Sequence, residues 1–180
     1  EVTVCIPEAL LLESKEVWLI GVKALIAHEF GHINFSDFKV FKMHQEKVAN
    51  YFWNTFGLRN MHKFGAMMLN ATEDGRMEKL QATFRPGMLK YFQFLNSYYW
   101  KINKCSGNEL NDFFLQIADL SVDGLVSPDF EARYAGTECE RRVNECRRYI
   151  VKAINCNDAQ KCADFTFQMI EKVGEYVADL

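Results

Sequence analysis

A chain of 180 residues is long enough to bury a hydrophobic core of its own, as one domain or as one domain with an added helical subdomain. Its hydrophobic content of 49% and aromatic content of 14%, with only 3 Pro and 10 Gly, are typical of a compact, helix-rich protein and exclude a disordered chain. The 21 Lys and Arg residues nearly balance the 24 Asp and Glu residues, so the charge gives no reason to expect a nucleic acid partner.

The first half of the chain is expected to begin with a short extended segment and to continue as three helices. The extended segment covers residues 2–6 and ends at Pro7. Ser14 can cap the first helix, and Gly57 ends the second, in which aromatic and apolar residues recur at spacings of three and four. The three helices are predicted over residues 14–33, 40–56 and 60–83.

The second half is predicted to contain four more helices. Pro86 suits the first turn of a helix that reaches about residue 104, and Asn108 can cap the next, which reaches about residue 125. Capping patterns that begin at Thr137 and Asn157 predict the last two helices. Residues 121–136 are interpreted as a loop and as the one plausible subdomain boundary. The fold class is therefore mainly α.

The apolar segments are too short to cross a membrane. Charged residues and His interrupt the longest of them before the roughly 18 apolar residues that a transmembrane helix needs. The segment from Glu1 to Pro7 has no basic region followed by an apolar stretch, which is the pattern of a secretory signal. We therefore expect no membrane partner, and a cytoplasmic location is favoured over secretion.

The six cysteines contain no C-x-x-C pair, so a structural zinc site made of thiolates is not expected. Four of them gather in the last quarter of the chain. They can join two helices through disulfides in an oxidising compartment, or remain free buried thiols, which is the simpler interpretation. The four residues are Cys139, Cys146, Cys156 and Cys162.

The first predicted helix carries the sequence His28-Glu29-Phe30-Gly31-His32. Residues four apart lie on one face of a helix, so His28 and His32 can bind one metal ion through their imidazole nitrogens. Glu29 can then take a proton from a metal-bound water, which is what metal-assisted hydrolysis requires. Gly31 leaves space for a second helix or a substrate backbone. The alternative is a pair of core histidines bonded to backbone carbonyls.

A tetrahedral zinc held by two histidines and a water lacks one protein ligand. A polar, acidic stretch that begins at Asn70 interrupts the otherwise apolar third helix, and carboxylates on a packed helix need a cation. Asp74 shares a face with Asn70 and Glu78, which would surround a ligand with hydrogen-bonding partners. Asp74 is therefore the predicted third ligand, and Glu73, with Arg76 as its expected neighbour, is the alternate.

Two further roles remain open at this point. Hydrolysis requires a group that stabilises the oxyanion, and Tyr91, Tyr98, Tyr99 and Tyr134 are equally available for it. Asp37 can orient a ligand histidine or cap the second helix, and capping is favoured.

Three blocks of the sequence resemble one protein family. They are the HEFGH block, the FSDF block that ends at Phe38, and the N-x-x-E-D-x-R-M-E block that begins at Asn70. In this order they look like the zincin-like metallopeptidase domains of bacterial and phage proteins, which often precede a von Willebrand factor A module. The resemblance covers about residues 20–80. Residues 86–180 match no family that we can name, and no von Willebrand module is present.

This resemblance implies a zinc-dependent peptidase fold with a peptide or protein substrate. His28 and His32 would bind zinc, one carboxylate of the Glu73-Asp74 pair would complete the site, and Glu29 would act as the base. The zincin-like metal-binding domain would cover residues 1–120, and residues 121–180 would form a helical C-terminal extension or part of the same domain.

The predicted function is therefore hydrolysis of a peptide bond by a zinc-activated water, with Glu29 as general base. One alternative is a catalytically inactive module that keeps zinc for stability or for binding a partner. The intact Glu29 counts against it, because a structural site has no use for a base. The other alternative is an all-α interaction domain without metal.

Overall fold

The computed structural model describes residues 6–180, and every regular element in that part is helical, which confirms the mainly α prediction. The expected extended segment at residues 2–6 lies outside the described residues except for Ile6. None of the described helices is long and apolar enough to cross a membrane. The elements are α1 (Glu8–Leu11), α2 (Lys15–Phe35), α3 (Phe38–Phe56), α4 (His62–Phe84), the 3-10 turn η1 (Pro86–Met88), α5 (Leu89–Ile102), α6 (Glu109–Val122), α7 (Pro128–Tyr134), α8 (Glu138–Ile154) and α9 (Ala159–Asp179).

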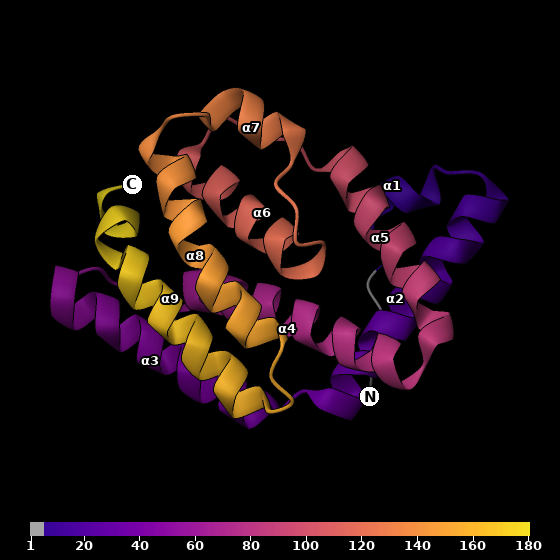
Figure 1. Ribbon diagram of the computed structural model, residues 1–180, viewed down its shortest axis with the longest axis horizontal. Coiled ribbons are helices and arrows are strands. Elements are labelled where there is room, and N and C mark those ends of the chain that lie inside the picture. Colours follow the sequence, from indigo (N-terminus) through magenta and orange to yellow (C-terminus); the bar gives the residue numbers. More distant parts are fainter. Residues whose placement is uncertain (1–5) are drawn as a thin grey trace.

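Helix α4 runs through the middle of the fold (Figure 1). On one side it packs against α3, α6, α8 and α9, which enclose the main hydrophobic core with it. On the other side it packs against α2, and α1, α2 and α5 enclose a second, smaller core. Because α4 contacts both groups of helices, residues on it can join side chains from α2 to side chains from α6.

The predicted helix starts are found, with local differences. Ser14, Asp37, Asn108 and Thr137 each accept a hydrogen bond from a backbone N–H of the helix that follows, so the favoured capping role of Asp37 is confirmed. The last helix is capped by Asp158, one residue later than the expected start.

The interpretation of residues 121–136 as a loop is wrong, because α7 lies within them. Ser127 accepts a hydrogen bond from Phe130 N at 3.1 Å, and Pro128 occupies the first helical turn, where its missing N–H costs nothing. Phe130 and Tyr134 of this short helix are buried in the main core. Helices α8 and α9 contribute to the same core, between α3, α4 and α6.

The described cysteines are free thiols, and Cys139, Cys146 and Cys162 are buried. Cys156, in the turn before α9, is half-buried and donates to the backbone carbonyls of Ala153 and Asp158. Of the two interpretations of the C-terminal cysteines, the structure has the free-thiol form.

Gly75 allows α4 and α6 to approach closely. A Cβ at this position would lie 2.0 Å from the backbone oxygen of Ser121, which cannot move without displacing α6. We expect Gly75→Ala to lower the free energy of unfolding by about 1–3 kcal/mol or more, through overpacking. Chemical denaturation measures this effect, and Gly87→Ala is the control, because nothing lies within 4 Å of its added Cβ. Equal stability of the two variants would contradict the close approach.

Candidate metal centre

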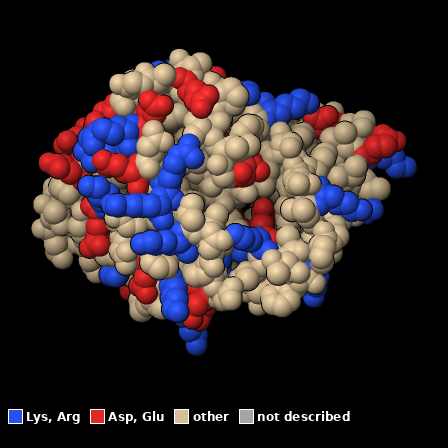
Figure 2. All heavy atoms as spheres, viewed as in Figure 1, with Lys and Arg blue, Asp and Glu red and all other residues tan. Residues whose placement is uncertain are grey.

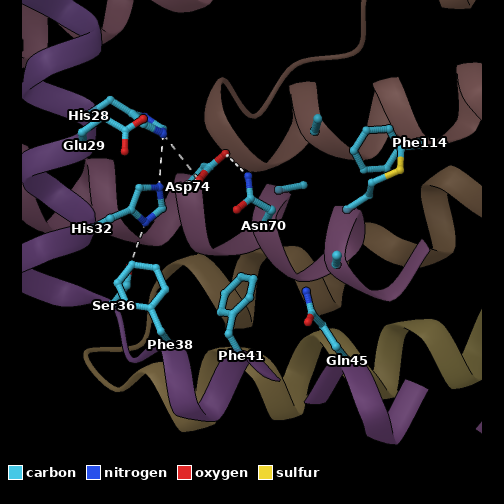
Figure 3. A pocket seen from close by; sticks show the side chains of 14 residues that line it. His28, Glu29, His32, Ser36, Phe38, Phe41, Gln45, Asn70, Asp74 and Phe114 are labelled. Carbon is cyan, nitrogen blue, oxygen red and sulfur yellow. Dashed lines mark hydrogen bonds and ion pairs between the residues drawn. The ribbon is translucent and has the colours of Figure 1, made fainter. Parts of the chain in front are cut away.

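His28, His32 and Asp74 bring three ligand atoms to one point between α2 and α4 (Figure 3). Nε2 of His28 and Nε2 of His32 are 3.2 Å apart. Oδ1 of Asp74 lies 3.0 Å from Nε2 of His32 and 3.6 Å from Nε2 of His28. Asp74 follows His32 by 42 positions in the sequence, so the fold brings it to the two histidines. Among the described residues these three form the one group of three or more that could hold a metal ion.

The far side of each ligand is held by a hydrogen bond. Nδ1 of His28 lies 2.9 Å from Oε1 of Glu78, and Nδ1 of His32 lies 2.9 Å from Oγ of Ser36. Because an ionised Glu78 can only accept, Nδ1 of His28 is the donor, and this leaves Nε2 free to bind an ion in the neutral tautomer. Asn70 Nδ2 donates to the outer oxygen of Asp74 at 3.1 Å.

The inner oxygen of Asp74 has no hydrogen-bond donor. Oδ1 is buried, and although it lies 3.0 Å from Nε2 of His32, that contact does not have the geometry of a hydrogen bond. The two imidazole nitrogens, which lie within hydrogen-bonding distance of each other, and this unsatisfied carboxylate oxygen therefore converge on one point. A buried carboxylate oxygen without a donor is stabilised by a positive charge at that point, which either a metal ion or a proton on an imidazole supplies.

The acidic surroundings of His28 change its pKa. Burial alone would lower it, but the hydrogen bond to Glu78 and the charges of Asp74, Glu78 and Glu29 raise it to about 9. His28 is therefore protonated at neutral pH in the metal-free protein, and the charge on its ring partly offsets the carboxylates. A bound metal ion would take the place of this proton.

Local sequence explains why the ligands face α4. Apolar residues lie on most sides of α2, and this helix is buried at Ala24, Ala27 and Gly31. A Cβ on Gly31 would lie 1.8 Å from Sδ of Met77, so the glycine allows α4 to pack against the turn that carries both histidines. Of the two roles considered for Gly31, the structure shows the approach of a second helix.

Glu73, the alternate ligand, faces away from the histidines. Nε of Arg76 donates to its Oε2 at 2.8 Å, and Nη2 donates to its Oε1 at 2.5 Å. Arg76 also donates to the backbone oxygen of Phe35 at 2.6 Å, and so ties α4 to the end of α2. Both charged side chains are almost completely buried, at 2% and 1% exposure. Glu73 thus belongs to a buried ion pair beside the metal centre.

Glu29 lies next to His28 and lines the same cavity as the three ligand side chains (Figure 3). The cavity has a volume of about 600 Å³ and lies between α2, α3, α4 and α6. Its other walls are mostly apolar and aromatic, and include Phe38, Phe41 and Phe114. A carboxylate, a metal-binding group and space for a substrate therefore meet here.

A second, smaller cavity of about 200 Å³ lies on the other side of Asp74, between α4, α5 and α6. His28 and Asp74 line it as well. Of the four candidate tyrosines, Tyr99 is the one that lines a cavity shared with the metal centre. Tyr98 is buried in the smaller core, Tyr91 packs against that core, and Tyr134 donates to Asp112.

The other two histidines of the chain have different surroundings. His44 is buried on α3 and interacts with the backbone oxygen of Val40 and with Asp164, both at 3.0 Å. His62 is exposed at the start of α4. Neither takes part in the metal centre.

Two supporting contacts differ from those expected from the sequence or were missed. Glu78 was expected beside Asp74, but it bonds to His28, because α4 crosses α2 at this point. The role of Ser36 was missed, although its position four residues after His32 places it one turn further along the same face.

Comparison with protein-family models, curated proteins and solved structures found no match. The geometry of these residues therefore carries the functional assignment.

Proposed function

We propose that this chain binds zinc through His28, His32 and Asp74 and hydrolyses peptide bonds, with Glu29 as the general base. The observation that carries the proposal is the convergence of three potential ligand atoms, from His28, His32 and Asp74, beside the carboxylate of Glu29 in one cavity. Zinc supplies a Lewis acid and lowers the pKa of a bound water to near neutral. The resemblance to zincin-like metallopeptidase domains supports the same assignment.

The spacing of the ligand atoms fits a tetrahedral ion. With bonds of about 2.0–2.1 Å, two ligands of a tetrahedral zinc lie about 3.3 Å apart. The three separations here are 3.2, 3.0 and 3.6 Å. Three protein ligands leave the fourth position open to the cavity, as catalytic zinc sites do.

Two histidines and a carboxylate also form the ligand set of non-haem iron(II) enzymes. Glu29 favours hydrolysis, because a base next to the ligands has a direct role in removing a proton from water. Glu29 makes no hydrogen bond or ion pair with another described side chain, so its carboxylate is free to accept that proton.

We assign the stabilisation of the oxyanion on the substrate carbonyl to Tyr99. It lines the smaller cavity together with His28 and Asp74. Burial and the negative charge of Asp74 raise the pKa of its phenol, so it stays protonated and can donate a hydrogen bond.

Ser36 is expected to strengthen zinc binding by holding the ring of His32. Ser36→Ala should weaken zinc affinity by about 10-fold, within the usual effect of losing a hydrogen bond to a ligand. Competition with a fluorescent zinc chelator measures this. Ser97→Ala, on the exposed side of α5, is the control and should bind zinc as tightly as the unchanged protein. Equal affinities of all three proteins would show that Ser36 has no such role.

Metal analysis and peptide cleavage test the proposed function. Protein purified without chelator should contain about one zinc per chain and little iron, and His28→Ala should contain almost none. The zinc-loaded protein should cleave members of a broad peptide library. Removal of zinc by a chelator should stop cleavage, and added zinc should restore it. Bound zinc without cleavage would favour the alternative of a catalytically inactive binding module. Absence of bound metal would favour the alternative of an all-α interaction domain without metal.

A further inference from the structure

The two cavities meet at the metal centre and form one continuous cleft. They share His28, Ala71, Asp74 and Ala118. Along α4, the residues before Asp74 line the larger cavity, and Glu78 after it lines the smaller one. Along α6, Phe114 lines the larger cavity and Asp119 lines the smaller one. The order is the same on both helices, so the cleft runs along them and passes the metal centre.

The two halves of this cleft differ in chemistry. Apart from the metal-binding group and Glu29, the larger half is lined by no charged residue, and its apolar walls include Phe38, Phe41 and Met67. The smaller half contains the carboxylates of Glu78, Asp119 and Asp123. Figure 2 shows acidic atoms inside a hollow of the surface, with basic atoms at its edge.

Asp119 forms no ion pair. It is only 9% exposed and lines the smaller cavity, and among the described residues its side chain forms no hydrogen bond of normal geometry. Burial and the charge of Asp123 raise its pKa to about 7, although a hydrogen-bonding interaction with Trp100 and the charge of Lys104 oppose this rise. Nε1 of Trp100, which lines the same cavity, is the donor beside Asp119, but its contact does not have the geometry of a full hydrogen bond. A buried carboxylate of this kind is stabilised by a cation.

The cation that fits this cavity is a side chain and not a second metal ion. Among the described residues, the carboxylates of the smaller cavity form no group of three or more that lie close enough to bind one ion together. The cavity of about 200 Å³ has room for a flexible side chain, and Tyr99 and Trp100 form aromatic walls. The stems of Lys and Arg pack against such walls while their charged ends reach carboxylates.

We propose that the substrate is a polypeptide that lies along α4 and α6 across the metal centre. A bulky apolar side chain occupies the larger cavity on one side of the cleaved bond, and a Lys or Arg side chain occupies the smaller cavity on the other side. Asp119 and Asp123 bind its charged end. This inference rests on the proposed peptidase function, because it takes the metal centre as the position of the cleaved bond.

Binding is measured first, without turnover. Zinc-loaded Glu29→Gln protein is titrated with fluorescent peptides that contain Phe next to Lys in either order. Replacing Lys with norleucine, which keeps the stem and removes the charge, should weaken binding by about 10-fold or more. Replacing Phe with Ser should also weaken it. These comparisons change only the peptide, so they do not depend on the folding of a variant.

Variants then locate the charge recognition. In the same background, Asp119→Asn with Asp123→Asn should bind the Lys and norleucine peptides equally well. The control is Glu175→Gln with Asp179→Asn, which removes two exposed charges on α9, far from the cavity lining, and should keep the preference for Lys. Zinc content and circular dichroism verify that the variants are folded and loaded.

The results separate this inference from the proposed function. Cleavage by the unchanged protein, with equal binding of Lys and norleucine peptides to Glu29→Gln, would overturn the inference and leave the peptidase intact. Selective binding without any cleavage would support the cleft assignment and count against the peptidase. If the protein neither bound the Lys peptide selectively nor cleaved any peptide, both the inference and the proposed function would be overturned.

Discussion

Asp74→Ala should lower zinc affinity by more than about 100-fold, because losing a direct ligand exceeds the usual 10- to 100-fold effect of residues behind the ligands. The fold should remain, since Oδ1 of Asp74 has no hydrogen-bond donor and its removal leaves no partner unpaired on that side. The neighbouring change Glu73→Ala should instead keep zinc affinity and lower the free energy of unfolding. It leaves the buried Arg76 without its counter-ion, which costs about 3–5 kcal/mol of the free energy of unfolding.

Two measurements on the same pair of variants separate these roles. Zinc affinity comes from competition with a chelator, and stability comes from chemical denaturation of the metal-free proteins, so that loss of bound zinc does not count as loss of fold. We expect Glu73→Ala that is still folded to bind zinc within about 10-fold of the unchanged protein. If Glu73→Ala lost zinc and Asp74→Ala kept it, the third ligand would be Glu73.

The helices of this protein could be predicted from local sequence because their signals are local. Ser14, Asp37, Asn108 and Thr137 precede helices as capping residues, and Gly57 ends α3 in the left-handed conformation, with φ of 72°. Such signals act over three or four residues, which a sequence displays directly. The wrong prediction at α7 also has a local cause. Its Ser-Pro start is present in the sequence, but a helix of seven residues offers too little periodicity to stand out from a loop.

The candidate site could be predicted only in part, because its completion depends on how helices cross. The spacing of His28 and His32 indicates a shared face, and the periodicity of α4 separates Asp74 from Glu73. Which of these carboxylates faces α2 follows from the rotation of α4, and the hydrogen bond from Arg76 to the backbone oxygen of Phe35 at the end of α2 holds that rotation. The acidic cavity could not be foreseen, since Asp119 comes to line the same cavity as His28 and Asp74 only through the packing of α6 against α4.

Glu29→Gln should abolish hydrolysis while keeping the fold and the zinc. Glutamine has the size of glutamate but cannot take the proton from a metal-bound water, and proton transfer of this kind contributes about 10²- to 10⁴-fold in rate. The side chain lines the cavity without a hydrogen bond to another described side chain, so its replacement breaks no contact that holds α2 in place. Zinc affinity should change little, because Glu29 is not among the three converging ligands.

The measurement is the rate of peptide cleavage at equal zinc occupancy, with Glu16→Gln as the matched control. Glu16 lies in the first turn of the same helix, exposed and outside the cavity, so this control makes the same chemical change without touching the site. Glu16→Gln should cleave at the unchanged rate, and Glu29→Gln should fall by at least about 100-fold. Loss in both variants would point to damage to α2. Equal cleavage by Glu29→Gln and the unchanged protein would show that Glu29 is not the base, because glutamine cannot accept the proton from the water.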